Sequence, residues 1–180
     1  MNDTLYMNGG SYSIGESPFK EAFTHGNRVF YGGSEARVTD RKWNAIISLN
    51  ERHKRESIVD IKVPDFGVTR IFNLHCFNFD APFLSKDEWL KLINELPSGE
   101  IAVCCYGGKG RTGTALAVLR ALLTGDLSDP ILTIRKSYRK EAVESDKQID
   151  YISSITGIES VAKAEHFGNY LYDADFWHNY

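Results

Sequence analysis

The sequence predicts an α/β protein, with a central and mainly parallel sheet of four to five strands covered by helices on both faces. Two observations support this class. Short apolar runs at residues 44–49 and 101–105 have the length and composition of buried strands. Stretches with helical periodicity follow such runs along the chain. Because 180 residues with 42% hydrophobic content can bury one substantial core, we expect residues 1–180 to form a single domain.

Five strands are expected after a poorly ordered lead-in. Residues 1–24 are rich in Gly, Ser and Asn, which favours disorder over a packed element. The alternation in IVDIKV, residues 58–63, is typical of an edge strand. The expected strands lie at residues 28–31, 44–49, 58–63, 69–74 and 101–105.

Capping signals mark the expected helices. Ser85 and Glu88 form a capping-box pattern, and Ser145 with Gln148 forms a second one. Asp129 precedes Pro130, the order expected for an N-cap followed by the first helical residue. A central helix is expected to open near Thr112 and to end at Gly125.

Composition limits the function classes. The net charge of -3 and a pI near 6.0 give no global electrostatic case for nucleic-acid binding. Three cysteines without paired spacing argue against a disulfide framework, and no apolar run approaches membrane-spanning length. We therefore expect a cytoplasmic protein. The aromatic-rich tail, residues 166–180, has no role that the sequence reveals.

The stretch that organises the chain is a strand, a glycine-rich turn and a helix within residues 99–125. Cys105 ends the strand and Arg111 opens the helix. Such a turn directs backbone N–H groups into one concavity at the positive end of a helix dipole, which suits a phosphate-sized anion. A thiol at a helix N-terminus beside a guanidinium should be a thiolate near neutrality.

The segment Cys-Tyr-Gly-Gly-Lys-Gly-Arg-Thr, residues 105–112, resembles the Cys-x5-Arg-Ser/Thr signature of the cysteine-based protein tyrosine and dual-specificity phosphatases. Its Tyr-Gly-Gly is most similar to the cyclin-dependent kinase inhibitor 3 type. The resemblance covers roughly residues 28–155, and residues 101–113 carry most of its specificity. It implies a dual-specificity phosphatase-like fold that hydrolyses phosphate monoesters through a phosphocysteine, without a metal or another cofactor.

The resemblance also implies roles for individual residues. Cys105 would be the nucleophile, and Thr112 would donate a hydrogen bond to its sulfur or simply cap the helix. Gln148 would position the hydrolytic water, although the capping box explains this residue equally well. The phosphate would be bound by the Arg111 side chain and by the backbone N–H groups of Tyr106, Gly107, Gly108, Lys109, Gly110 and Arg111.

The general acid is harder to assign. Relatives take the proton from an Asp four residues before a Pro, but that position before Pro82 is Asn78, which cannot donate one. Asp80 lies two residues further on and is the preferred candidate. Asp65, in the phrase Val-Pro-Asp-Phe-Gly, is the alternative, although it precedes Cys105 by 40 residues.

Two further cysteines need an interpretation. Cys104 stands where these phosphatases usually have His, and strand alternation predicts a buried thiol facing away from Cys105. Cys76 precedes the acid loop, which carries Asn78, Asp80 and Pro82. A buried core thiol is favoured there over a disulfide partner for the nucleophile.

Several alternatives remain open from the sequence. Residues 108–113 also fit Gly-x-Gly-x-x-Gly, although that dinucleotide-binding motif usually opens a domain. A structural Cys in a glycine turn leaves Arg111 unexplained. Phosphorylated proteins are the default substrates. Lys109 raises the case for a highly charged substrate such as a phosphoinositide or an RNA 5′ end, and Asn78 with Cys104 raises the case for a pseudophosphatase that only binds phosphorylated partners.

Overall fold

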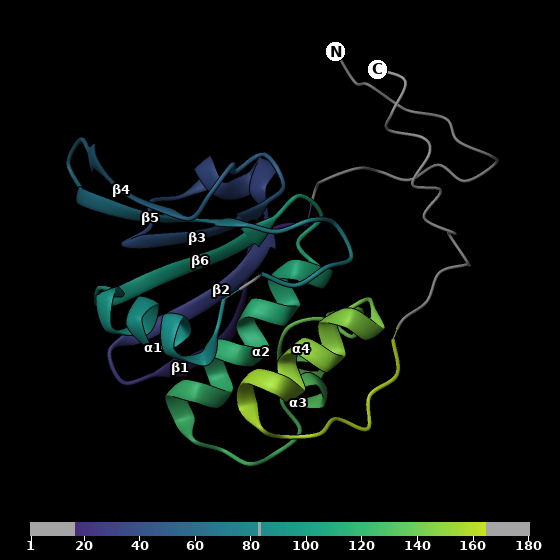
Figure 1. Ribbon diagram of the computed structural model, residues 1–180. Helices are drawn as coiled ribbons and strands as arrows, with labels where there is room; N and C mark the ends of the chain where they lie inside the picture. Colours follow the sequence, from purple (N-terminus) through teal and green to yellow (C-terminus); the bar gives the residue numbers. More distant parts are fainter. Residues whose placement is uncertain (1–16, 83, 165–180) are drawn as a thin grey trace, which may run out of the picture.

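The computed structural model describes residues 17–82 and 84–164 and shows one six-stranded sheet, ordered β1-β2-β6-β3-β5-β4 (Figure 1). Strands β2, β6, β3 and β5 are parallel to one another, and β1 and β4 add to the two edges in antiparallel fashion. The α/β class and the parallel centre are confirmed, but the sheet is larger than expected. Its strands are β1 (Lys20–His25), β2 (Arg28–Ser34), β3 (Ala45–Asn50), β4 (Ser57–Val63), β5 (Gly67–His75) and β6 (Gly99–Cys105).

The described part of the chain has four α-helices, and they lie on one face of the sheet (Figure 1). Helix α2 contacts β6, β2 and β1 and also contacts each of the other three α-helices, while the 3-10 helix η1 contacts β2 and β6. Helical cover on both faces was expected, but within residues 17–82 and 84–164 the second face carries only η1. The reason is the connection from β3 to β5, which runs through strand β4 and supplies no helix. The helices are η1 (Glu35–Asp40), α1 (Lys86–Glu95), α2 (Gly110–Thr124), α3 (Pro130–Ser137) and α4 (Asp146–Thr156).

Strand β1 corrects the expected lead-in. Residues 20–25 pair with β2 through a tight turn in which Gly26 takes φ +59°. The pairing register shifts between Glu21 and Phe23, which is why the strand shows no regular alternation. Residues 1–16 and the tail at 166–180 lie outside the described residues.

The helix boundaries follow the capping signals closely. Both capping boxes form, at Ser85 and at Ser145, and the Asp129 carboxylate accepts from the backbone N–H groups of the first turn of α3. Helix α2 ends with Gly125 in the left-handed conformation, as expected, but it begins at Gly110, two residues earlier than the sequence suggested. The glycine-rich turn is therefore shorter than it looks in the sequence.

Helix α2 is buried on nearly all sides between the sheet and helices α3 and α4. Gly113 permits the close approach, because a Cβ there would lie 2.7 Å from the Cβ of Ala142. No helix within residues 17–82 and 84–164 is long and apolar enough to cross a membrane. The fully buried core side chains include Phe30, Ile47, Leu49, Ile101, Leu116, Leu119, Ile131 and Ile134.

The carboxyl ends of the parallel strands meet at one edge of the sheet. Ser34 pairs with Cys105 between β2 and β6, and Asn50 pairs with His75 between β3 and β5. In open α/β sheets the ligand site lies at this edge. The glycine-rich turn therefore stands where the fold favours a binding site.

Candidate active site

The turn between β6 and α2 brings together the side chains of the Cys-x5-Arg motif. Cys105 is the last residue of β6 and only 3% exposed, and Arg111 is the second residue of α2. The Thr112 hydroxyl donates a hydrogen bond to the Cys105 Sγ at 3.1 Å. A hydroxyl donor at this distance stabilises a thiolate, which is the reactive form of the sulfur.

Close packing accounts for two glycines of the turn, Gly108 and Gly110. Gly108 has φ +67°, and a Cβ there would lie 2.6 Å from the backbone carbon of Gly33. A Cβ on Gly110 would collide with the carboxylate of Glu144. In the described part of the chain only helices follow α2, so the βαβ unit of a dinucleotide site is not formed and that alternative is wrong.

Arg111 is buried and held by two loops from neighbouring strands. Its Nη1 donates to the backbone oxygen of Cys76 at 3.0 Å, and the same atom lies 3.6 Å from Oε2 of Glu51. The Arg111 side chain is 6% exposed, whereas the Glu51 side chain is 51% exposed. The guanidinium is therefore oriented by the loops after β5 and β3 before any anion binds.

Asp80 lies on the loop that follows β5, at the same end of the molecule. Its Oδ1 accepts from the backbone N–H of Ala81 at 2.9 Å, and its Oδ2 lies 3.5 Å from Nζ of Lys147. The preceding residue, Phe79, has φ +58°, which is unusual for a bulky side chain and indicates a constrained loop. The Asp80 carboxylate thus faces the N-terminus of α4.

Asp65 lies at the wrong end of the sheet. It occupies the turn between β4 and β5, before Gly67 begins β5. The nine residues of β5, at about 3.3 Å each, place Asp65 roughly 30 Å from the edge that carries Cys105. Asp65 is thereby excluded as a proton donor.

Glu144 is a site residue that the sequence analysis missed. It precedes the N-cap of α4, and its carboxylate accepts from the backbone N–H of Gly110. Burial raises the pKa of this carboxyl, although the Gly110 hydrogen bond and the charges of Lys109 and Arg111 oppose the shift. A carboxyl that retains its proton at higher pH, beside residues 105–111 (the candidate phosphate loop), is equipped to donate that proton.

A local signal for Glu144 exists in the backbone rather than in the motif. Val143 has φ +64°, a strained value for a β-branched residue. Among the described residues, positive φ outside glycine occurs at Val143, Phe79 and Asp65, and the first two directly precede Glu144 and Asp80. Strain of this kind gathers at functional sites.

Gln148 is fully buried, and its amide is already engaged. Its Oε1 accepts from the backbone N–H groups of Glu144 at 2.7 Å and Ser145 at 3.3 Å. Its Nε2 donates to the backbone oxygen of Asp80 at 3.0 Å. The capping interpretation is confirmed, and the side chain also ties the Asp80 loop to α4.

The two other cysteines are buried neutral thiols. Burial raises the pKa of Cys76 to about 12, so this thiol stays protonated near neutrality. Burial also raises the pKa of Cys104, which hydrogen-bonds with Ser48. No group of three His, Cys, Asp or Glu side chains suited to a metal ion occurs in residues 17–82 and 84–164.

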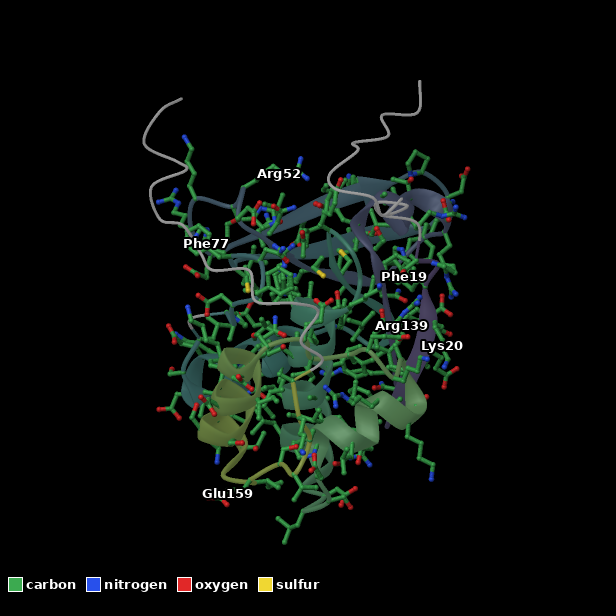
Figure 2. The ribbon with its side chains drawn as sticks, turned by 90° about the vertical axis from the view of Figure 1, so that its right-hand side faces the viewer. Phe19, Lys20, Arg52, Phe77, Arg139 and Glu159 are labelled. Atoms are coloured by element: carbon green, nitrogen blue, oxygen red, sulfur yellow. The ribbon has the colours of Figure 1, made fainter. Side chains whose placement is uncertain are left out.

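The surroundings of the site are accessible at one end of the molecule. Arg52 and Phe77 follow Glu51 and Cys76, the two residues that contact Arg111, and Figure 2 shows both at the same end. Glu159, after α4, lies at the opposite end (Figure 2). Tyr106, in the turn itself, is 49% exposed.

Comparisons with sequences give two archaeal relatives, and no family model matches the chain. The uncharacterised protein MJ0215 of Methanocaldococcus jannaschii is 29% identical over 113 residues, which are 62% of this chain and 61% of that protein. The uncharacterised protein MJECL20 of the same organism is 40% identical over 53 residues, which are 29% of this chain and 35% of that protein. The matches thus span about three fifths and one third of these relatives.

Comparisons with solved structures identify the fold. Tk-PTP in its active form superposes with a TM-score of 0.55 at 21% identity, over 76% of this chain and 96% of that one. The Trypanosoma cruzi protein tyrosine phosphatase TcPTP1 gives 0.58 at 13% identity, over 89% and 81%. PTPMT1 in complex with PI(5)P gives 0.50 at 14% identity, over 71% and 90%. The chain therefore has the fold of the protein tyrosine phosphatases.

Proposed function

We propose that this chain is a single-domain cysteine phosphatase that needs no metal and hydrolyses phosphate monoesters, with phosphorylated proteins as the default substrates. The observation that carries the proposal is the 3.1 Å hydrogen bond from Thr112 to the Cys105 sulfur, in a turn that also presents Arg111. The phosphatase fold and the three free thiols, which suit a reducing cytoplasm, support it.

The reaction would proceed in two displacements. The Cys105 thiolate attacks phosphorus, an S–P bond forms, and the bond from phosphorus to the leaving oxygen breaks. Arg111 and the N–H groups of residues 106–109 and 111 bind the equatorial oxygens. The Gly110 N–H was also expected from the sequence to bind the phosphate, but that group donates to the Glu144 carboxylate. Water then gives a proton to the carboxylate left by the first step and attacks the phosphocysteine, the S–P bond breaks, and inorganic phosphate leaves. Thr112 assists this second step because its hydroxyl stabilises the departing thiolate.

Two carboxyls compete for the role of proton donor. Asp80 was preferred from the sequence, and it lies on the loop beside Cys76. Glu144 contacts the phosphate loop itself, through Gly110, and its raised pKa favours the protonated form that a general acid needs. We therefore assign the donor role to Glu144 and retain Asp80 as the alternative.

The test is hydrolysis of a small aryl phosphate in EDTA by the wild-type protein and by Cys105→Ser. Turnover by the wild type that is lost in the variant supports the proposal. Trapping of labelled phosphate on Cys105 identifies the intermediate. A wild-type protein that binds phosphopeptides without turnover would instead be the pseudophosphatase suggested by Asn78 and Cys104.

A second candidate substrate class is a phosphoinositide or an RNA 5′ end. Lys109 is exposed within the phosphate loop, and Lys147 stands beside Asp80 with its side chain 76% exposed. Two flexible cations at the site suit a substrate with more than one phosphate. A panel of phosphorylated peptides, phosphoinositides and triphosphate-ended RNA, compared by kcat/KM, separates these substrates from phosphoproteins.

A further inference from the structure

Two carbonyl groups of the phosphate loop are bound by buried hydroxyls. The Ser34 hydroxyl donates to the backbone oxygen of Tyr106 at 2.6 Å. The Tyr138 hydroxyl donates to the backbone oxygen of Gly108 at 2.5 Å. Ser34 comes from the end of β2 and Tyr138 from the end of α3, so both bonds join the loop to distant parts of the chain.

Because the peptide bond is planar, each bound carbonyl fixes the direction of the N–H group of the following residue. In a trans peptide the C=O of one residue and the N–H of the next point in opposite directions. The bond from Ser34 therefore directs the N–H of Gly107 away from Ser34. In the same way, the bond from Tyr138 directs the N–H of Lys109 away from Tyr138.

Both hydroxyls lie on the buried side of the loop. Ser34 is fully buried and pairs with Cys105 across the sheet. Tyr138 is 1% exposed and packs beneath Gly32, where a Cβ would lie 2.5 Å from its ring. Away from them lies the open side of the loop, where Lys109 is exposed. Among the described residues, no acceptor is found for the N–H groups of residues 106–109.

The glycines of the loop make such restraint necessary. Gly107 has open space around it, and Gly108 already has a positive φ. Glycine populates both halves of the φ range with little preference, so these peptide planes could rotate if nothing held their carbonyls. A rotated plane would point a carbonyl oxygen at the anion and repel it.

Tyr138 is itself firmly placed. Lys20 Nζ donates to its backbone oxygen at 2.7 Å, and the Arg139 guanidinium lies 5.3 Å from the centre of its ring. Figure 2 shows Lys20 and Arg139 on the same side of the molecule. Burial raises the pKa of the Tyr138 phenol, which therefore remains a donor across the neutral range.

We infer that Ser34 and Tyr138 are positioning residues for oxyanion binding, whose hydroxyls hold the 106–107 and 108–109 peptide planes with their N–H groups toward the phosphate. The inference rests on the proposed function, because it assigns the phosphate to this loop. It adds a recognition element that lies outside the Cys-x5-Arg motif.

The decisive experiment measures tungstate binding by calorimetry in the wild-type protein and in Tyr138→Phe, with thermal unfolding recorded for both. The phenyl ring preserves the packing beneath Gly32 and removes only the hydroxyl. We expect the dissociation constant to rise about fivefold, as the loss of one buried hydrogen bond predicts. The inhibition constant of inorganic phosphate, a competitive inhibitor of aryl phosphate hydrolysis, should rise in parallel in Tyr138→Phe.

Tyr151→Phe is the matched control. The Tyr151 hydroxyl also donates to a backbone oxygen at 2.6 Å, that of Leu84, outside the phosphate loop. Its loss should lower stability as Tyr138→Phe does and leave tungstate affinity unchanged. Equal weakening in both variants, or unchanged affinity in a folded Tyr138→Phe, overturns the inference.

Tungstate binding by Ser34→Ala is a second measurement, and it tests the inference if Tyr138→Phe does not fold. It should also weaken tungstate binding about fivefold. Unchanged affinity in this variant would then refute the inference. A wild-type protein that binds tungstate but hydrolyses no phosphoester contradicts the proposed function and leaves the inference standing. A wild-type protein that binds no oxyanion contradicts both.

Discussion

The phosphate loop, residues 105–111, and the acid loop, residues 77–82, lie at the same end of the molecule and are built in different ways. The first is a compact glycine turn between a strand and a helix. The second contains no glycine and takes a positive φ at Phe79. Its backbone is bound by Gln148, through Asp80 at 3.0 Å, and by Ser145, through Phe79 at 2.6 Å.

The two loops differ in how much of each is specified by residues close together in sequence. In the proposed function, one short segment supplies the nucleophile, the guanidinium and the anion-binding N–H groups. The acid loop is held by partners 66 and 68 residues away in sequence, near the start of α4. That same segment carries Glu144, so the region of α4 both supports one carboxyl and presents another. We therefore expect the nucleophile to be insensitive to changes near α4, and the proton donor to be sensitive to them.

The largest effect should come from the nucleophile. Cys105→Ser should lower kcat by about 10⁴-fold or more, because a serine hydroxyl is a far weaker nucleophile than a thiolate in this site. Cys104→Ala, one residue away on the opposite side of the strand, should retain most of the activity. Steady-state hydrolysis of an aryl phosphate measures both, and a fully active Cys105→Ser would contradict the mechanism.

The proton donor should give the next largest effect. Glu144→Gln should lower kcat about a hundredfold toward a substrate with a poor leaving group. Since an acid acts in its protonated form, the wild-type rate should fall as pH rises through the pKa of Glu144, and the variant should lack this basic limb. Asp80→Asn should keep the limb. The reverse pattern in pH-rate profiles would transfer the role to Asp80.

A smaller effect should distinguish two adjacent glycines of the phosphate loop. Gly108→Ala should lower the free energy of unfolding by about 2 kcal/mol, because of its positive φ and of the Gly33 backbone 2.6 Å from the added Cβ. Gly107→Ala meets no atom within 4 Å and should be close to the wild type in stability. Urea unfolding compares the two, and equal losses would show that the loop tolerates no side chain at either position.

The smallest effect concerns stability and pH. The pKa of Glu144 is raised in the folded protein above its usual 4.5, so its contribution is present at low pH and is lost as pH rises through the folded value. Because glutamine does not titrate, Glu144→Gln removes this loss of stability at higher pH. The variant should therefore gain stability relative to the wild type as the pH rises above 4.5, the usual carboxyl pKa. A stability difference that stays constant over this range would show that the carboxyl titrates normally.

Local patterns predicted the helices and the nucleophile loop well. Capping at Ser85, Asp129 and Ser145 depends on hydrogen bonds within four residues, so sequence spacing is enough to locate it. Strand β1 was missed because its pairing bulge removes the alternation that identifies a strand. The one-sided layer of α-helices was missed because it depends on which crossovers contain a helix.

What the sequence by itself determined is the Cys105 turn: a strand, glycines and a helix start within a dozen residues leave the chain few other conformations. Only the tertiary structure decided which carboxyl stands beside it. The length of β5 places Asp65 at the far end of the sheet from Cys105. The packing of α2 against α4 brings Glu144 to Gly110. Contacts between residues far apart in sequence depend on how whole elements pack, and spacing along one segment does not record that.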